Sequence, residues 1–428
     1  MNSQMRRRDF LKVVGAAATS GALAGCATSS EPRKPIGRVI VIGGGYGGAT
    51  AARYLRRWSG GTVQVFLVDR EPNFISCPLS NLVLGGSRSI DYMTRSRAKL
   101  RDEGVQVLQD QVTGIDRAKK TIQLTKIQDL SYDRLVLSPG VDFMFDQLPG
   151  LNNAEAQKQV LHAWKAGPDT VALRRQLEAM TDGGIFVMSI PKAPYRCPPG
   201  PYERACQVAS YFKKAKPRSK VIVLDANEDV ISKGPLFKAA WNNLYKGIID
   251  YRNNAEAKDV DVAGRIVVTD FDKIKGDVLN VIPPMRAADI ARTSGLITAN
   301  NRWCGVNWQT TQSEVDPNIY ILGDATLSAA AMPKSGHMAN QHAKVAAAAI
   351  INAFTGVPPN PEPMVMNTCY SFVSDTDVIH VASVHRWDAE KKALLTIPGS
   401  GGVSTGPSAV EGENAHAWAQ NIWNDMLG

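Results

Sequence analysis

The fold is decided by a short stretch near the N-terminus, RVIVIGGGYGG, at residues 38–48 of the 428-residue chain. Residues 39–42 are apolar and β-branched, as a buried parallel strand requires. A Gly-rich run follows at once, and residues 49–55 (ATAARYL) have the composition of a helix. This order of strand, Gly-rich turn and helix predicts a Rossmann unit that binds a dinucleotide.

Three glycines of the turn fit the dinucleotide fingerprint. We expect Gly43 to make the tight turn, Gly45 to let the backbone approach the pyrophosphate, and Gly48 to let helix and strand pack closely. The N-terminus of the helix then supplies amide hydrogens to the phosphates. A second strand, predicted at residues 63–68, ends at Asp69, whose carboxylate is expected to bind the adenosine ribose.

Two later segments indicate flavin rather than nicotinamide. The stretch YDRLVLSPG at 132–140, which ends at Gly140, has the form of the strand that closes the FAD half of disulfide-reductase-like flavoproteins. The stretch IYILGDA at 319–325 is a strand that ends in Gly323 and Asp324, and in that superfamily the aspartate binds the ribityl chain of FAD. We therefore expect FAD, with an Ala-rich helix over residues 337–349 that points its N-terminus at the flavin ring.

Composition limits the classes of partner. The length suggests two or three domains, and 44% hydrophobic with 21% charged residues is typical of a globular protein. The net charge of +9 is spread without the basic run that marks nucleic-acid binding, so we expect no nucleic-acid partner, and we assign no metal site. The sequence contains no Cys-x-x-Cys-His motif, so any haem must sit on a separate partner chain.

The N-terminus predicts export. Residues 6–12, RRRDFLK, match the twin-arginine pattern, and the weakly apolar stretch that follows is shorter than the roughly 20 residues of a membrane span. We expect a periplasmic protein that is exported in the folded state. Residues 23–26, LAGC, have the pattern of a lipobox, so lipidation of Cys26 would anchor the protein to a membrane; ordinary cleavage a few residues later is the alternative.

Four further motifs carry a closer resemblance: CPLSN at 77–81, YRCPPGPYERA at 195–205, PKSG at 333–336 and NTCYS at 367–371. With them the chain, from about residue 36 to its end, resembles the flavoprotein subunit of flavocytochrome c sulfide dehydrogenase. The run CPPGPYER is the most specific part of the match. The resemblance implies an α/β fold with two Rossmann-like domains of the disulfide-reductase superfamily and a smaller α+β C-terminal domain.

The resemblance also implies roles for individual residues. Cys77 matches the position that joins FAD through a thioether, and Cys197 and Cys369 match the pair that forms a redox-active disulfide beside the ring. Lys334, in the third motif, belongs to the implied cofactor-binding residues. Glu203 could manage protons or tune thiol ionisation; a salt bridge to a neighbouring arginine is the alternative.

The implied chemistry agrees with general thiol chemistry. Sulfide is a nucleophile that would attack a disulfide sulfur, and the released thiolate could pass two electrons to the flavin. The flavin would give single electrons to the haem of a c-type cytochrome subunit, and sulfur would leave in elemental or polysulfide form. Cys206 and Cys304 have no role in this scheme and are expected to be buried small apolar residues.

The predicted organisation has five parts: a signal at 1–26, a first FAD-binding part at 36–150, a middle domain at 151–286, a second FAD-binding part at 287–358, and a C-terminal domain at 359–428. The middle domain has a good strand at residues 184–188, but it leads into SIPKAP at 189–194. Prolines stand where glycines would let backbone approach a pyrophosphate. We therefore expect this domain to keep the Rossmann fold without binding NAD(P)H.

Two alternatives remain. A sulfide:quinone oxidoreductase would share the fold and the substrate, and a lipid anchor at Cys26 would suit it. Against it stand the CPPGPYER match and residues 415–427, which read as a short segment with few apolar residues on any one face. A non-catalytic flavin lipoprotein that carries electrons is the other alternative, but it gives no reason for Cys77, Cys197 and Cys369.

Overall fold

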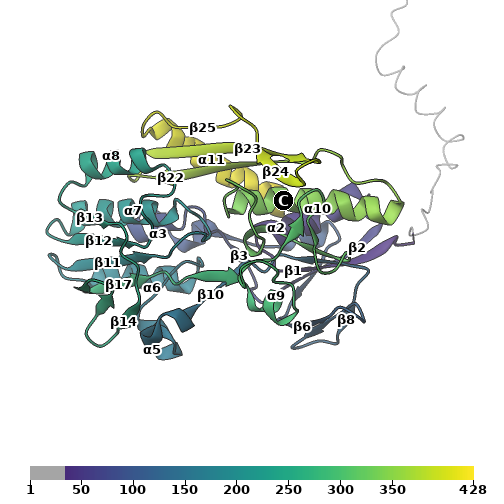
Figure 1. Ribbon diagram of the computed structural model, residues 1–428, viewed down its shortest axis with the longest axis horizontal. Helices are drawn as coiled ribbons and strands as arrows, with labels where there is room; N and C mark the ends of the chain where they lie inside the picture. Colours follow the sequence, from purple (N-terminus) through teal and green to yellow (C-terminus); the bar gives the residue numbers. More distant parts are fainter. Residues whose placement is uncertain (1–33) are drawn as a thin grey trace, which may run out of the picture. The chain divides into compact units, whose positions relative to one another are not determined.

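The computed structural model describes residues 34–428, shown as a ribbon in Figure 1. The twin-arginine pattern and the lipobox cysteine, Cys26, lie outside the described residues. Residues 36–428 form one compact unit. Among the described residues, no helix has the length and apolar character needed to cross a membrane.

The first sheet joins two segments that are far apart in the sequence. Its strand order is β19-β20-β21-β9-β1-β2-β5. The centre is parallel, because β1 pairs with β2 and β9, and β9 pairs with β21. The bounds are β1 Gly37–Ile42, β2 Val63–Asp69, β5 Gln106–Gln109, β9 Arg134–Leu137, β19 Val306–Asn307, β20 Gln312–Ser313 and β21 Ile319–Ile321.

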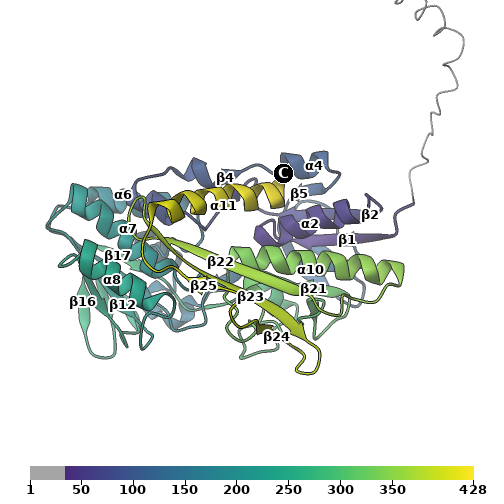
Figure 2. The same cartoon turned by 90° about the horizontal axis from the view of Figure 1, so that it is seen from above.

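Two helices, α2 (Tyr46–Trp58) and α10 (Gly336–Thr355), pack against each other beside this sheet (Figure 2). The apolar residues 39–41 of β1 are completely buried, which explains why this strand lies in the centre of the sheet. Short elements connect the strands. They are β3 Phe74–Ile75, α3 Asn81–Gly85, η1 Ile90–Met93, β4 Thr94–Arg95, α4 Ala98–Asp102, β6 Val112–Asp116, β7 Thr121–Leu124, β8 Leu130–Ser131 and η4 Gly323–Ala325.

The second sheet is parallel throughout, in the order β13-β12-β11-β17. Its strands and principal helices are β11 Ile185–Ile190, β12 Lys220–Asp225, β13 Ile249–Arg252, β17 Val278–Val281, α6 Pro168–Ala179, α7 Gly200–Ala215 and α8 Gly234–Leu244. The remaining elements of this region are η2 Phe145–Gln147, η3 Pro149–Leu151, α5 Ala154–Gln159, β14 Asp259–Asp261, β15 Ile266–Val268 and β16 Lys273–Lys275. An antiparallel pair follows with a short helix: β10 Val141–Phe143, β18 Met285–Ala287 and α9 Asp289–Thr293.

A third, antiparallel sheet contains β22 (Met364–Phe372), β23 (Val378–Asp388), β24 (Ala393–Thr396) and β25 (Gly402–Val403). Its strand β22 contacts both α7 and α10, so it links the helices of the other two sheets (Figure 1). The sheet is followed by α11 (Ala409–Leu427). The predicted α/β fold with two Rossmann-like sheets and a smaller α+β region is confirmed.

The last helix differs from the prediction. Residues 415–427 were expected to carry few apolar residues on any one face, whereas α11 is a 19-residue helix with a clear buried stripe. Its buried residues Ala415, Ala419, Trp423 and Met426 follow helical spacing, and the helix packs on α2. Two of these four buried residues are alanines, which contribute little apolar character to the sequence pattern, so the sequence does not display the face clearly. This apolar face is therefore covered by the protein itself.

Candidate active site

The Gly-rich turn has the geometry that its sequence predicts. Gly43 has a positive φ of 91°, which only glycine adopts without strain. A Cβ atom at Gly48 would lie 1.7 Å from the Gly43 oxygen, so helix and strand approach as closely as expected. A Cβ atom at Gly45 would meet nothing within 4 Å, and the same is true at Gly140. The N-terminus of α2 has no side-chain cap, so its amides remain free for phosphate.

Asp69 stands at the end of β2 and contacts the same turn. Its carboxylate accepts hydrogen bonds from the Gly44 N–H at 2.5 Å and from Arg97 at 3.0 Å. Arg97 also donates to the carbonyl of Gly44. The predicted contact of Asp69 with a ribose stays a prediction, and the structure adds Arg97 as the residue that orients this carboxylate.

The second acid that the sequence assigns to the cofactor site, Asp324, is also in place. Asp324 follows β21, and its buried Oδ1 atom has no hydrogen-bond partner among residues 34–428. Gly323 before it has a φ of 66° and packs on α10, where a Cβ atom would lie 2.9 Å from Ala339. A buried carboxylate oxygen without a partner costs free energy unless a ligand supplies a donor. The open glycines and this oxygen fit a cofactor that carries both phosphates and hydroxyl groups.

The three motif cysteines come from three separate segments. Cys77 precedes α3, Cys197 lies in the turn between β11 and α7, and Cys369 is in β22. All three are free thiols in the structure and are partly exposed, so the predicted disulfide stays a prediction. Cys197 adopts a left-handed φ of 57°. It occupies the strand-to-helix turn where a nucleotide-binding Rossmann unit has its phosphate loop.

Arg196 connects Cys77 with the cofactor segment. Its Nη2 atom donates to Cys77 Sγ at 2.6 Å and to the Trp164 carbonyl at 2.7 Å. Although burial lowers the pKa of Arg196, the charges of Cys77 and Asp324 hold it above its ordinary value. The N–H of Cys197 donates to the carbonyl of Lys334 at 2.8 Å. Arg196 and the Cys197 turn therefore place the thiols beside the Asp324 segment.

Lys334 is buried beneath this segment. Its Nζ atom donates to the carbonyls of Asp324 and Thr326 and lies 3.7 Å from the centre of the Trp303 ring. Burial lowers the pKa of Lys334 to about 8, although the Asp324 charge raises it. These contacts are with protein groups, so Lys334 stabilises the backbone of the segment that carries Asp324. Direct binding of a cofactor by Lys334 stays a prediction.

Glu203 connects the three segments that carry the motif cysteines through hydrogen bonds. Its carboxylate accepts from the Asn81 side chain at 2.8 Å and from the Phe372 N–H at 2.9 Å. Asn81 follows Cys77 by four positions, Phe372 follows Cys369 by three, and Glu203 itself is in the first turn of α7 after Cys197. The expected alternative, a salt bridge to a neighbouring arginine, is wrong, because Arg204 donates instead to Asn81 and Asn280. Burial raises the pKa of Glu203.

The thiols act on each other electrostatically. Burial, followed by the charges of Cys369 and Glu203, raises the pKa of Cys197. Burial also raises the pKa of Cys369, while Lys233 and a hydrogen bond from Asn367 at 3.2 Å lower it. Sequence reasoning missed Arg196, Asn81 and Lys233 as members of the site. The first two lie inside the quoted motifs, but no pattern distinguishes Lys233 from a surface lysine.

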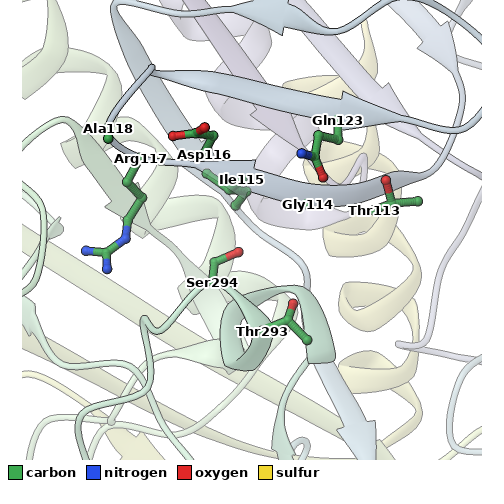
Figure 3. A pocket seen from close by; sticks show the side chains of 9 residues that line it. All are labelled: Thr113, Gly114, Ile115, Asp116, Arg117, Ala118, Gln123, Thr293 and Ser294. Carbon is green, nitrogen blue, oxygen red and sulfur yellow. The ribbon is translucent and has the colours of Figure 1, made fainter.

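The remaining two cysteines are buried, as predicted. Cys206 and Cys304 are completely buried, and Cys206 accepts a hydrogen bond from the Trp241 indole at 3.2 Å. A surface hollow of about 790 Å³ lies between the β6–β7 hairpin and the end of α9 (Figure 3). It is lined by residues 113–118, 123, 293 and 294. None of the predicted site residues lines this hollow.

Family models match three parts of the chain. The model described as "Pyridine nucleotide-disulphide oxidoreductase" matches residues 37–180. The model described as "Sulfide dehydrogenase (flavocytochrome c) flavoprotein chain, central" matches residues 170–283. The model described as "Flavocytochrome c sulphide dehydrogenase, flavin-binding" matches residues 361–427, which include Cys369. The last of these indicates a flavin, in agreement with the Gly-rich turn and Asp324.

Individual relatives agree. The sulfide dehydrogenase (flavocytochrome c) flavoprotein chain of Chlorobaculum thiosulfatiphilum is 48% identical over 46 residues, which cover 11% of this chain and 94% of that one. The mitochondrial sulfide:quinone oxidoreductase of Mus musculus is 24% identical over 67% of this chain, and the match spans 65% of the mouse protein. The solved sulfide:quinone oxidoreductase of Aquifex aeolicus is 17% identical, with a TM-score of 0.73 over 91% of this chain and 92% of that one. Over residues 170–283 and 361–427 the chain is thus similar to the flavoprotein chain of flavocytochrome c sulfide dehydrogenase, a flavin-dependent oxidoreductase.

Proposed function

We propose that the protein oxidises sulfide to elemental sulfur or polysulfide and passes the electrons to a c-type cytochrome on a separate chain. One observation carries the proposal: Glu203 binds the segments of Cys77 and Cys369 from the helix that follows Cys197. Three thiols from distant parts of the sequence thereby meet beside the segment of Asp324. A non-catalytic electron carrier has no need of this arrangement.

The chemistry begins with a disulfide between Cys197 and Cys369. The anion HS⁻ attacks one sulfur, a new S–S bond forms to the incoming sulfur, and the bond between the cysteines breaks. One cysteine then carries a persulfide and the other is a thiolate, so two electrons are stored in the protein. FAD, when bound, accepts an electron pair and releases electrons singly to a one-electron acceptor.

The residues fit FAD. Gly45 and Gly140 leave room for the pyrophosphate and the approach of the ring, and the unpartnered Asp324 Oδ1 can accept a ribityl hydroxyl. Cys77 is the proposed attachment point, because its sulfur lies beside Arg196, which also faces Asp324. Covalent attachment is thus supported by position and by the family resemblance.

The acceptor and the location are also proposals. The matches to the flavoprotein chain of flavocytochrome c sulfide dehydrogenase favour a cytochrome subunit as the partner. The N-terminal pattern favours export to the periplasm by the twin-arginine route, with Cys26 as a possible lipid attachment site. Because the apolar face of α11 is packed on α2, this helix offers no apolar stripe to a membrane. Mass spectrometry of the mature N-terminus would decide the fate of Cys26.

The deciding experiment adds sulfide, and separately NADH, to the purified flavoprotein without oxygen and follows the flavin absorbance. We expect bleaching by sulfide alone, reversed by oxidised cytochrome c and not by a soluble quinone. Reoxidation by the quinone alone would instead assign a sulfide:quinone oxidoreductase. Bleaching by NADH would refute the expectation that the middle domain binds no nucleotide.

Cysteine variants separate the roles of the thiols. Cys197→Ser and Cys369→Ser should abolish bleaching by sulfide while flavin is retained. Cys206→Ala removes a buried cysteine outside the site and serves as the matched control. Cys77→Ala should release the flavin on acid precipitation, whereas the other variants keep it in the pellet. Sulfide turnover near the wild-type rate in Cys197→Ser would exclude the disulfide mechanism.

A further inference from the structure

Lys233 is a buried lysine that the mechanism above does not use. It precedes α8, in the middle domain, and its side chain and backbone are only 8% exposed. Its backbone has a left-handed φ of 57°, which costs free energy in a residue other than glycine. Cys197 has the same unusual φ. Burial and strain together indicate that the position of this side chain is fixed by the fold.

The ammonium group points at the Cys369 strand. Its Nζ atom donates to the Cys369 carbonyl at 2.9 Å, to Ser371 Oγ at 2.8 Å and to the Ile379 carbonyl at 3.4 Å. These acceptors are all neutral, and within residues 34–428 the structure gives Lys233 no salt bridge. The side chain reaches from the start of α8, in the middle domain, to β22.

A buried ammonium whose acceptors are all neutral is unfavourable, because burial removes the water that stabilises its charge and no contacting carboxylate replaces that stabilisation. Burial accordingly lowers the pKa of Lys233 to about 8. Four acidic groups oppose this and raise its pKa, in the order Cys369, Glu203, Cys197 and Glu411. The strongest of them, Cys369, carries a negative charge only as a thiolate. The Lys233 ammonium therefore has its strongest negative partner, the Cys369 thiolate, only when the cysteine pair is reduced.

We propose that Lys233 is the counter-ion of the Cys369 thiolate. The proposal rests on the function proposed above and deepens it. When HS⁻ bonds to Cys197 Sγ, the Cys197–Cys369 bond breaks, and its electron pair stays on Cys369 as the leaving thiolate. Lys233 stabilises that thiolate, so the incoming sulfur ends as a persulfide on Cys197. Lys233 acts through Cys369 and is therefore a positioning residue.

The test compares three substitutions in the flavoprotein after reduction with a phosphine. Lys233→Met removes the charge and the donor, Lys233→Gln keeps a donor without charge, and Lys233→Arg keeps the charge. Lys238→Met, in the helix that begins directly after Lys233, is the matched control, since Lys238 is paired with Asp229 at the surface. The rate of alkylation of Cys369 and of Cys197 by iodoacetamide is followed against pH by peptide mass spectrometry.

We expect the pH midpoint for Cys369 to rise by about one unit or more in Lys233→Met and Lys233→Gln, because an opposite charge nearby favours the ionised thiol. Lys233→Arg should retain the wild-type midpoint, and Lys238→Met should leave it unchanged. If Lys233→Gln behaves as the wild type, the side chain serves only as a hydrogen-bond donor, and the proposal is overturned. An equal shift in Lys238→Met would overturn it as well.

A redox titration separates this inference from the function itself. Equilibration with glutathione should show a Cys197–Cys369 disulfide whose reduction is at least tenfold less favourable in Lys233→Met, or about 30 mV for a two-electron couple. If the wild type forms no disulfide at all, the proposed function fails. The alkylation profiles still decide the role of Lys233 in that case, because they use the reduced thiols.

Discussion

The carboxylate of Glu203 should be worth more to stability than any surface charge of the chain. Its two oxygens accept from the buried Asn81 amide and the Phe372 N–H. Hydrogen bonds to charged groups contribute about 1.5–3 kcal/mol each, so Glu203→Ala leaves two donors unsatisfied at a gross cost of about 3–6 kcal/mol. Removal of the buried carboxylate itself offsets part of that cost, so we expect about 3 kcal/mol.

Glu203→Gln should cost less, about 1.5–3 kcal/mol, because one oxygen can still accept from Phe372. The new amide would face the Asn81 amide donor to donor. Asn81 cannot rotate to relieve this, since it also donates to the Gly200 carbonyl at 3.1 Å and accepts from Arg204 at 3.1 Å.

Urea unfolding followed by tryptophan fluorescence measures both variants. Glu155→Ala is the control, because Glu155 makes only an exposed ion pair with Lys158. That pair should contribute less than about 1 kcal/mol. The reasoning is refuted if Glu203→Ala is no more destabilising than Glu155→Ala, or if Glu203→Gln costs more than Glu203→Ala.

Three further predictions concern the cofactor cradle, the thiol turn and acid stability. Gly48→Ala should abolish flavin retention, because its Cβ would lie 1.7 Å from a backbone oxygen. Gly45→Ala, whose Cβ would meet nothing within 4 Å, should fold normally and only weaken flavin binding. The flavin content after gel filtration measures both effects. Gly200→Ala places a Cβ 2.8 Å from Cys197 Sγ, so it should cost about 1–3 kcal/mol of unfolding free energy and slow the bleaching by sulfide; a wild-type rate would contradict this. Burial lowers the pKa of His162 and His342 to about 3, and that of His337 to about 4. Between about pH 6.5 and pH 4 the unfolded chain therefore binds these protons and the folded protein does not, so stability should fall with acid by about 1.4 kcal/mol per pH unit for each histidine. Urea midpoints at pH 7 and pH 5 measure this loss, and equal midpoints would exclude it.

The fold and the cofactor cradle follow from local sequence. The strand at 39–42 and the three glycines report on contacts within a few residues of one another, and the structure gives Gly43 and Gly48 the expected geometry. The Gly323–Asp324 pair is recognisable for the same reason, because a strand precedes it and a helix follows. Patterns of this kind depend on short-range sterics, which a sequence displays directly.

The electrostatic part of the active site could not be predicted this way. Lys233 stands in the polar, Gly- and Pro-containing stretch SKGP at 232–235, which reads as an exposed loop, yet long-range packing buries it. Glu203 had a salt bridge to a neighbouring arginine as one of two expected roles, but adjacent helical residues, such as Glu203 and Arg204, do not face each other. Its partners, Asn81 and Phe372, are more than a hundred positions away. Patterns of neighbouring residues do not reveal contacts between residues so far apart in the sequence.

The strand order of the first sheet also determines how much of the chain must be synthesised before this sheet can be completed. A ribosome delivers β1, β2 and β9 early, but β21, which borders β9, follows only after the whole middle region has been made. Until then the fully buried residues 135–137 of β9 present an open strand edge, a surface that invites mispairing. The helix α11, which packs on α2, is made later still. Because the proposed flavin site combines the Gly-rich turn after β1 with Asp324 after β21, flavin cannot be fully bound before the segment of Asp324 has been made.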